Sequence, residues 1–221
     1  GGVAVGGRVG RYTGSIRRTL TRVFDSVTVG SNVPPFQTGG RWDYSGVAAT
    51  LGASADLGDQ AFISGSIRFG GDLDATASPD TEASNETVTL PTRLRIGGSY
   101  LLAPDLVANG GFQYSDWSDT DPSGRTEWTV GGGVEWTGSR ILGKDGAWRI
   151  GGHRSQLPLL PDGAGSGNET IFSGGFALEL VRNETAPLGW FDFTLEFGSR
   201  SFGDISESIV RSTLSVSIAG I

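Results

Sequence analysis

Strict alternation between apolar and polar side chains recurs along this chain and constrains the fold more than any other feature. The clearest example lies within residues 189–201, where Phe191, Phe193, Leu195 and Phe197 alternate with Asp192, Thr194 and Glu196. A period of two residues is typical of a β-strand with one apolar face. In a soluble sandwich that face points at a protein core, whereas in an outer-membrane barrel it points at lipid.

The alternation predicts about ten antiparallel strands. They are expected at residues 2–24, 41–54, 60–71, 87–101, 105–117, 125–137, 146–155, 169–182, 188–200 and 207–220. In the first strand the apolar parity changes halfway, which predicts a bulge or glycine kink near Thr13 and Gly14. The strand at 41–54 has the weakest pattern, because Trp42 and Tyr44 have the opposite parity from its later apolar residues.

The predicted connections alternate in length along the chain. Long polar connections are expected at 25–40, 72–86, 117–124, 156–168 and 201–206, and short turns at 55–59, 102–104, 138–145 and 183–187. Successive connections of an antiparallel sheet lie at opposite ends of the strands, so the long connections gather at one end, as in bacterial outer-membrane barrels. Aromatic residues near the predicted strand ends fit interfacial girdles. These features favour a transmembrane β-barrel over the alternative of a soluble all-β domain.

Composition agrees with a closed and strongly bent sheet. The chain has 37 Gly among 221 residues, against a usual share of about 7%, and small residues suit a curved wall. No apolar run approaches the ~20 residues that a membrane-spanning helix needs. The net charge of −7 argues against a nucleic-acid partner. Because the chain has no Cys and no Met, it offers no thiolate chemistry and is expected to begin inside a longer precursor.

Several stretches resemble the carboxy-terminal part of the FadL/OmpP1-type outer-membrane transporters of hydrophobic compounds. These stretches come in the family's order: LPTRLRIGGSYLLAPDLVANGGFQYSDWSD at 90–119, DGAWRIGGHRSQLPL at 145–159, ETIFSGGFALEL at 169–180 and ESIVRSTLSVSIAGI at 207–221. The matching residues are mostly structural ones: Leu90, Pro91, Trp117, Ser118, Trp148, Ser155 and Pro158. The resemblance implies a single barrel domain over 1–221, in the bacterial outer membrane, that passively transports long-chain fatty acids or other hydrophobic compounds.

The chain also departs from that family. Family barrels have fourteen strands and an amino-terminal plug, whereas about ten strands are readable here, so the plug and the first strands are expected to be missing. The family's ligand-binding residues in the plug therefore have no counterpart in this sequence. The alternative function is a structural barrel that docks partner proteins through its long extracellular loops, at 25–40 and 72–86.

The polar column of the predicted strands supplies the candidate lumen-lining residues. They are Arg95, Asn109, Gln113, Glu127, Glu135, Arg149, His153, Glu179, Asp192, Glu196 and Arg211. The carboxylates among them face basic candidates, including Arg93, and are expected to form ion pairs, because an unpaired buried charge is costly. A polar track for a permeating head group is the functional alternative.

Catalytic and metal chemistry have weak support in the sequence. His153 and Ser155 share a strand face and form the only candidate nucleophile pair, but no third residue is assignable to orient the imidazole. A polar lining role for His153 is favoured, and the chain is predicted not to be an enzyme. The acidic stretches at 72–80 and 118–126 match no fixed calcium-loop spacing and are explained as turns. We therefore expect no cofactor and no metal.

Overall fold

The chain forms a single antiparallel sheet. The computed structural model describes residues 1–22, 36–79, 84–117, 120, 126–157, 167–182 and 187–218. The strands are β1 (Val3–Arg22), β2 (Phe36–Leu57), β3 (Ala61–Phe69), β4 (Asp72–Ala77), β5 (Glu86–Thr89), β6 (Arg93–Ala103), β7 (Leu106–Asp116), β8 (Thr126–Ile141), β9 (Lys144–Leu157), β10 (Gly167–Arg182), β11 (Pro187–Phe202) and β12 (Ile205–Ile218). No membrane-crossing helix occurs within these described ranges.

Twelve strands replace the predicted ten because the predicted strand at 87–101 is divided into β5 and β6, and because β4 lies in the predicted loop 72–86. β3 pairs with residues 49–57 of β2, and β4 pairs with residues 42–46 of the same strand, so β3 and β4 are one pass of the chain broken at Gly70–Gly71. β5 and β6 follow that pass on its other side and are broken at residues 90–92. The remaining passes lie near their predicted positions.

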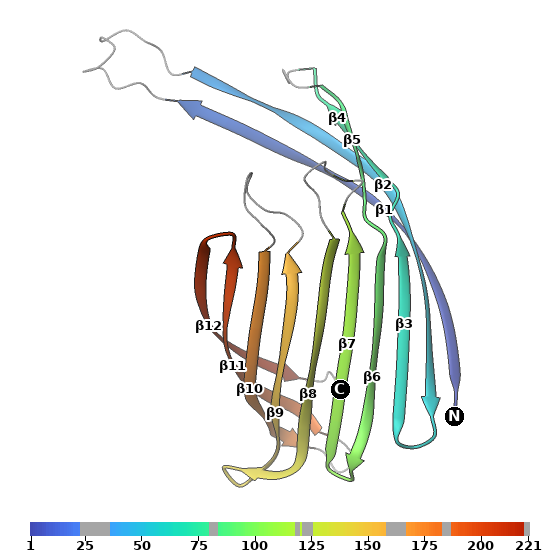
Figure 1. Cartoon of the computed structure of the whole chain (residues 1–221), viewed down its shortest axis with the longest axis vertical. Helices are drawn as coiled ribbons and strands as arrows, with labels where there is room; N and C mark the ends of the chain where they lie inside the picture. Colours follow the sequence, from blue (N-terminus) through green and yellow to red (C-terminus); the bar gives the residue numbers. More distant parts are fainter. Residues whose placement is uncertain are drawn as a thin grey trace, which may run out of the picture.

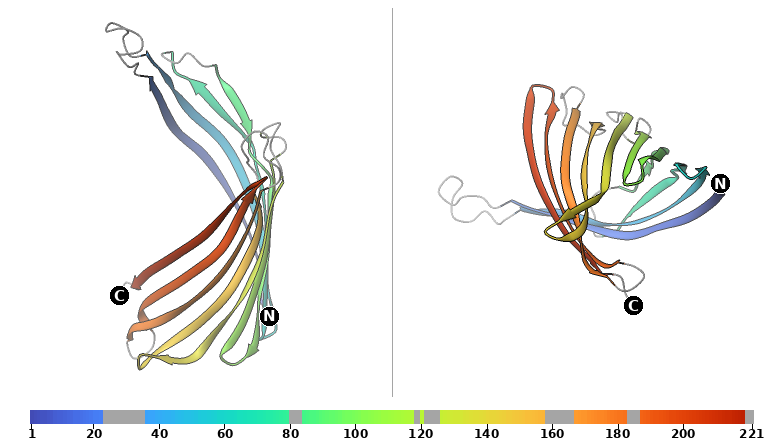
Figure 2. Two further views of the ribbon diagram at one scale, coloured as in Figure 1. Left: turned by 60° about the vertical axis from the view of Figure 1, so that its left-hand side comes forward. Right: turned by 90° about the horizontal axis from the view of Figure 1, so that it is seen from below.

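The sheet is open. β12 lies at one edge, the order runs through β11, β10, β9, β8, β7, β6 and β3 to β2, and β1 pairs only with β2 at the other edge. Figures 1 and 2 show a single, strongly curved layer whose two edges do not meet. The all-β antiparallel fold is therefore confirmed, but the described strands do not close into a barrel.

Most connections fall as predicted, with two exceptions. β11 and β12 are joined by a tight turn at Gly203 and Asp204, where a long connection was predicted; Gly203 has φ 55°, which glycine adopts readily. The predicted loop 72–86 holds β4 and part of β5. The apolar stretch at 158–161, most of the acidic stretch at 118–126 and the turn at 183–186 lie outside the described residues.

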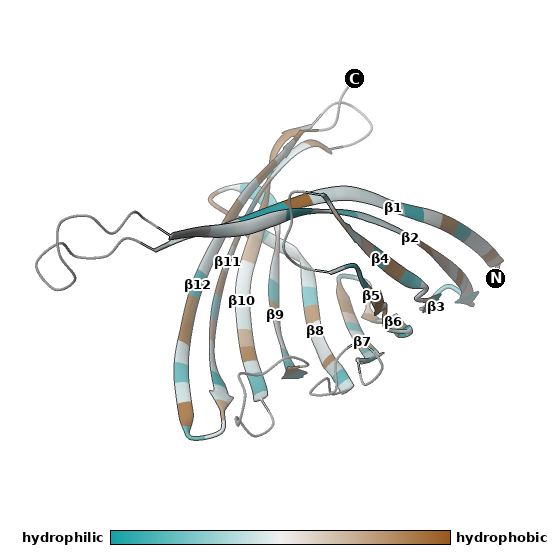
Figure 3. Cartoon of the chain, turned by 90° about the horizontal axis from the view of Figure 1, so that it is seen from above, coloured by the Kyte–Doolittle hydropathy of each residue, from teal (hydrophilic) through white to brown (hydrophobic). Residues whose placement is uncertain are grey.

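Side chains crowd on one side of the sheet, which identifies its concave face. The buried residues include Ala147, Ser155, Ile171 and Ala177, and the pairing register places all four on the same face. The opposite, convex face exposes large apolar side chains, such as Phe172, which is 67% exposed. No second sheet or helix covers this convex face in the described part of the chain (Figure 3).

The predicted bulge in the first strand is wrong. β1 and β2 pair without a shift from Val3 opposite Ala55 to Arg22 opposite Phe36. The parity change instead reflects a change of face: apolar side chains lie on the convex face near Val3 and on the concave face near Ile16. The same inversion explains the weak pattern at 41–54, because Trp42 and Tyr44 point to the concave side with Ile16.

β4 and β5 show the same inversion of polarity, but in these strands it results from a β-bulge. Two residues of β2, between Gly46 and Ala49, face three residues between Phe69 and Leu73, so one extra residue reverses the alternation. Gly70 lies at this bulge, where a Cβ would come within 1.9 Å of the carbonyl oxygen of Leu90. We call residues 12–22, 36–46, β4 and β5 the arm; in Figure 1 it extends beyond the ends of the other strands.

The arm has a polar convex face, and its large apolar side chains lie on its concave face, which also carries Arg18 and Glu86. On its convex side Thr87 and Thr89 donate hydrogen bonds to Asp74 and Asp72 at 2.9 and 3.0 Å, so these acidic residues lie on strands with hydroxyl partners. Its concave side carries the apolar residues Tyr12, Ile16, Leu20, Trp42, Tyr44, Leu73, Ala75 and Val88. The polarity of both faces is thus the reverse of that in the rest of the sheet.

Candidate functional site

The candidate site is the concave face below the arm. The register places every predicted lining residue on this face: Arg95, Asn109, Gln113, Glu127, Glu135, Arg149, His153, Glu179, Asp192, Glu196 and Arg211. They share this face because residues two apart on a strand point to the same side of the sheet, and so do residues directly opposite one another on paired strands. Whether they line a closed lumen stays a prediction.

Ion pairs link the strands of one half of this face. Arg149 on β9 binds Glu135 on β8 and also reaches Asp192 on β11, with 2.6 Å between Nη1 and Oδ1. Arg211 on β12 binds Glu196 on β11. The predicted pairing is therefore confirmed for these two arginines, and it ties β8, β9, β11 and β12 together.

A second charged group surrounds His153. Its Nε2 lies 3.5 Å from Oε1 of Glu169, and Arg200 donates from Nε to the other oxygen of that carboxylate at 2.9 Å. Sequence reasoning missed Glu169 and Arg200, although Glu169 has the same parity as the buried column of β10. The histidine is thus paired with an acidic residue from the neighbouring strand.

The nucleophile pair is not assembled. His153 and Ser155 share the concave face as predicted, but the hydroxyl of Ser155 shares a hydrogen bond of 2.9 Å with the hydroxyl of Thr129. Ser155 is 8% exposed, and no hydrogen bond joins it to the imidazole among the described residues. This geometry offers no activated nucleophile.

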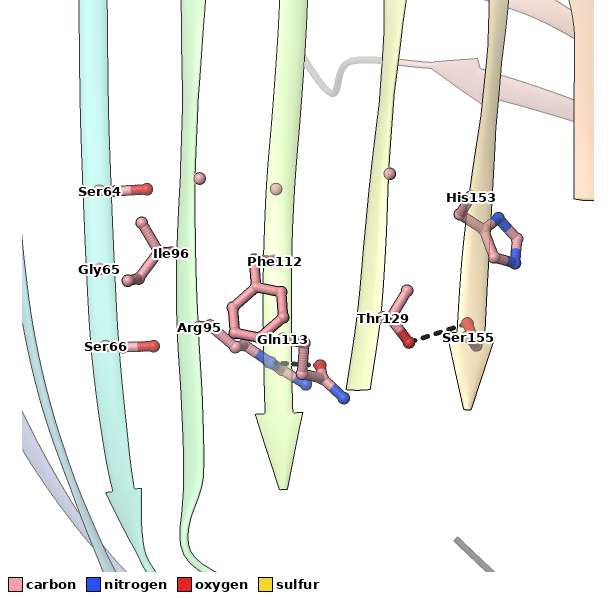
Figure 4. Close-up of a pocket in the computed structure, with 13 residues that line it drawn as sticks. Ser64, Gly65, Ser66, Arg95, Ile96, Phe112, Gln113, Thr129, His153 and Ser155 are labelled. Carbon is pink, nitrogen blue, oxygen red and sulfur yellow. Dashed lines mark hydrogen bonds between the residues drawn. The ribbon is translucent and has the colours of Figure 1, made fainter. Parts of the chain in front are cut away.

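A hollow of about 730 Å³ opens on the concave face between β3 and β9. Figure 4 shows polar side chains along it, including Arg95 and Gln113 joined by a hydrogen bond of 2.8 Å. Glycines leave the space open at Gly97, Gly111 and Gly131, since each has a hydrogen where a side chain would project. The volume is in the range of pockets that hold small organic ligands.

Glu127 and Glu179 have separate surroundings. Glu127 accepts hydrogen bonds from Nε1 of Trp117 at 3.1 Å and from Nε2 of Gln113 at 3.5 Å. Glu179 is 7% exposed and lies opposite Trp190 in the register. Both carboxylates are therefore fixed within the sheet rather than projecting freely from it.

Four arginines gather at the base of the arm, and we call them the arginine cluster. Its members are Arg8, Arg68, Arg93 and Arg95. The expected pairing with carboxylates is wrong for Arg93 and Arg95, whose Nε atoms donate to neutral oxygens of Ser115, at 3.1 Å, and of Gln113. In the described part of the chain, none of the four lies in an ion pair.

The described ranges contain no group of acidic and histidine residues that could hold a metal ion. The sequence matches no protein-family model and no curated protein. The resemblance to FadL/OmpP1-type transporters therefore stays a prediction, and the functional argument depends on the fold and on the two faces of the sheet.

Proposed function

We propose that this sheet is the wall of a bacterial outer-membrane β-barrel whose convex face contacts lipid. The observation that carries this proposal is the exposure of large apolar side chains on the convex face below the arm: Phe172, Val210 and Leu214 are 67, 70 and 64% exposed. Monomeric soluble proteins rarely expose apolar patches larger than a few hundred Å². Bilayer hydrocarbon is a cover that fits a continuous face of this kind.

The height of the apolar band supports the same proposal. On β8, Trp128 and Trp136 both lie on the convex face, eight residues apart, or about 26 Å along the strand. A strand tilt of about 40° reduces the vertical distance to about 20 Å, near the ~25 Å apolar band of known barrels. Tyr114 lies beside Trp128, and Trp148 beside Trp136, so each limit of the band carries aromatic neighbours.

The band also runs obliquely across the hydrogen-bonded rows. In β1 the convex residues of the band lie at 3–9. Rows of directly paired residues that start there and cross the whole sheet end in β12 at Val210 or at a residue before it. In β12, however, the convex apolar residues continue from Val210 to Ile218. A horizontal membrane crossing tilted strands gives this displacement, whereas a core between aligned sheets has no reason to follow it.

The inversion of polarity in the arm fits a water boundary. Below the arm the convex side faces hydrocarbon in our proposal, and above it the convex side carries Asp72, Asp74, Thr87 and Thr89, which suit water. The arm lies at the end of the strands where the long connections are, and in outer-membrane barrels this end is extracellular. Both ends of the described chain, Gly1 and Ile218, then belong to the periplasmic side.

The activity that we propose is passive uptake of hydrophobic compounds, long-chain fatty acids among them. It is supported by the apolar concave side of the arm, followed by the hollow on the concave face below it. An apolar solute gains about 25 cal/mol for each Å² removed from water, so the apolar side chains of the arm would favour its capture before it reaches the polar concave face below.

Uptake of a labelled fatty acid into liposomes that contain the purified protein tests this activity. We expect a flux well above that of protein-free liposomes, and a lower flux for Ile16→Ser, which makes the concave side of the arm more polar. Thr87→Ser, on the convex side, is the matched control and should transport normally. A flux equal to that of empty liposomes refutes the transport proposal.

A second candidate function is a scaffold that docks partner proteins on the arm. The observation in its favour is that Ile16 and Leu20 are 57 and 51% exposed on a hairpin that extends past the other strands. Copurification of a defined partner that is lost in Ile16→Ser, together with absent fatty-acid flux in the wild type, would favour this function over uptake.

A further inference from the structure

A shallow groove crosses the convex face of the sheet. Hollows of about 690 and 770 Å³ lie along it and meet at Val130. Large side chains close its two ends, Ile63 on β3 and Phe172 on β10. Between them the floor is one row of directly paired glycines on neighbouring strands: Gly98 on β6, Gly110 on β7, Gly132 on β8 and Gly152 on β9. We call this surface the glycine groove.

The walls of the glycine groove are apolar, with one exception. On the side of the row that faces the periplasm in our proposal, the convex residues are Tyr100, Ala108, Val134 and Ile150. On the extracellular side they are Ile96, Phe112, Val130 and Arg154. The walls therefore offer apolar contact along the row and a positive charge at one corner.

The row is inclined to the plane of the proposed membrane. Continued across the sheet, it runs from Val3 in β1 to Val210 in β12. Val3 begins the apolar band at the periplasmic end of β1, and Val210 begins it at the extracellular end of β12, so the groove descends into the bilayer from Gly152 to Gly98. It crosses three strand spacings, about 14 Å, which is near half of a hydrocarbon core of ~30 Å. An acyl chain of one leaflet therefore fits along it.

Arg154 has no acidic neighbour to neutralise it. It lies directly opposite Val130 on β8 and Thr170 on β10. Its other neighbours on the convex face are Trp128, Gly132, Gly152, Gln156, Asn168 and Phe172. Among the described residues, Arg154 takes part in none of the ion pairs.

The depth of Arg154 suits a lipid head group. Trp128, which limits the apolar band, lies opposite Gln156, and Arg154 is two residues below Gln156, about 7 Å along the strand. A long basic side chain at this depth extends its charge toward the interface. A guanidinium there offers two parallel N–H donors that match the oxygens of a phosphate.

We propose that the glycine groove binds one lipid of the extracellular leaflet, with its phosphate group on Arg154 and an acyl chain along the row of glycines. Charge complementarity favours this occupant, because the phosphate supplies the anion that Arg154 lacks and the attached chain supplies the apolar contact that the walls require. The inference rests on the proposal that the convex face contacts a bilayer, and it adds a specific ligand to that face. It makes no use of the uptake of a solute.

Native mass spectrometry of the purified protein in a neutral detergent tests the site. The probes are dimyristoyl phosphatidate, dimyristoylglycerol, which has the same chains without phosphate, and inorganic phosphate. One phosphatidate should bind per protein, at least ~10-fold more tightly than either other probe, since hydrogen bonds to a charged group then add to the contact of the chain. Equal affinity for phosphatidate and dimyristoylglycerol, or for phosphatidate and inorganic phosphate, overturns the proposal.

Substitution of Arg154 tests the head-group contact. Arg154→Gln should weaken phosphatidate binding by ~10-fold or more and leave dimyristoylglycerol binding unchanged, while Arg154→Lys should give an intermediate loss. Arg140→Gln is the control, because Arg140 lies near the opposite end of the strands, beside Asp145. Unchanged phosphatidate affinity in Arg154→Gln refutes the site.

Gly110→Leu tests the groove by filling it. A Cβ at Gly110 would meet its nearest atom, the carbonyl oxygen of Gly131, at 3.6 Å, so the backbone accepts a side chain and the affinity for both lipids should fall. Gly174→Leu is the matched control, since Gly174 lies on the convex face outside the groove and its Cβ would have 4.0 Å of clearance. Undiminished lipid binding in Gly110→Leu overturns the proposal. Dimers that this variant abolishes, without selective lipid binding, also overturn it, because they assign the groove to a second copy of the chain.

Two stability measurements separate the lipid site from other roles. In the absence of lipid, Arg154→Gln should keep the thermal midpoint of the wild type or raise it, whereas a structural arginine would give a lower midpoint. Leu214→Arg, on the convex face away from the groove, tests bilayer contact by itself. A large loss of stability for Leu214→Arg in lipid vesicles, without selective lipid binding by the wild type, refutes this inference alone. No loss refutes the proposed membrane contact and the lipid site with it.

Discussion

Arg149 and Asp192 form an ion pair across an intervening strand. The guanidinium projects from β9 and the carboxylate from β11, yet Nη1 and Oδ1 are 2.6 Å apart. Between them, β10 presents Gly175 directly opposite Arg149, so no side chain blocks the path. The same guanidinium also binds Glu135 on β8, and one side chain thereby connects β8, β9 and β11 across the intervening β10.

Replacing Arg149 with Gln should lower the free energy of unfolding by about 1 kcal/mol, since half-exposed ion pairs contribute little individually and two are lost. Urea unfolding in lipid vesicles measures the change. Arg140→Gln provides the matched control: its side chain is 80% exposed and 3.6 Å from Asp145, and we expect no measurable effect. Equal losses in the two variants would show that the interstrand network does not stabilise the sheet.

Adjacent glycines on β10 should respond in opposite directions to the same substitution. A Cβ at Gly175 would come within 2.3 Å of the carbonyl oxygen of Phe193, whereas at Gly174 the nearest atom lies 4.0 Å away. Gly175→Ala should therefore cost about 1–3 kcal/mol through overpacking. Gly174→Ala should be neutral or stabilise by up to about 1 kcal/mol, because it reduces the entropy of the unfolded chain. The same urea series measures both, and a tolerated Gly175→Ala contradicts the close approach.

The turn between β8 and β9 contains an unfavourable residue. Leu142 has φ 54° and Gly143 has φ 78°, as in a type I′ turn, where Asn-Gly is preferred. Leu142→Asn should stabilise the protein by about 1 kcal/mol, since asparagine tolerates this backbone conformation better. Leu142→Ala is the control and should give no gain, because alanine keeps the steric penalty. Leu142 is 89% exposed, so little packing is lost in either variant.

Strand positions were predictable from the sequence because each pass has its own alternation. Residues 105–117 and 169–182, for example, were expected as strands and are found as β7 and β10. The two interruptions were not predictable, since the bulge at Gly70 depends on how β4 pairs with β2. The parity change in β1 does not by itself distinguish a bulge from an inversion of polarity, because that requires the register of the neighbouring strand.

The concave face was predictable as a set of residues, but its pairing was not. Parity placed Arg93, Arg95, Arg149 and Arg211 on one face, and all four are there. Which arginine finds a carboxylate depends on the order of strands and on register, so the difference between Arg149 and Arg93 has no signal in the sequence. Arg8 and Arg68 were missed because nothing in the local pattern of β1 or β3 indicates that both lie beside Thr50.

Lipid contact on the convex face gives a specific prediction for Leu214. This side chain is 64% exposed, lies opposite Phe193 and is midway along the apolar residues of β12. If hydrocarbon covers it, Leu214→Arg should lower the free energy of unfolding in lipid vesicles by about 2–4 kcal/mol. If water covers it, the change should stay within about 0.5 kcal/mol, as for other surface substitutions.

Two controls make that measurement specific. Leu214→Ala measures the loss of apolar contact without a charge, and Thr87→Arg adds the same charge to the convex face of the arm, which lies outside the bilayer in our proposal. Thr87→Arg should cost less than about 1 kcal/mol, because charge is tolerated near and beyond the interface. A cost for Leu214→Arg no greater than that for Thr87→Arg would mean that the convex face does not contact hydrocarbon. The barrel and the uptake proposal would then both be rejected.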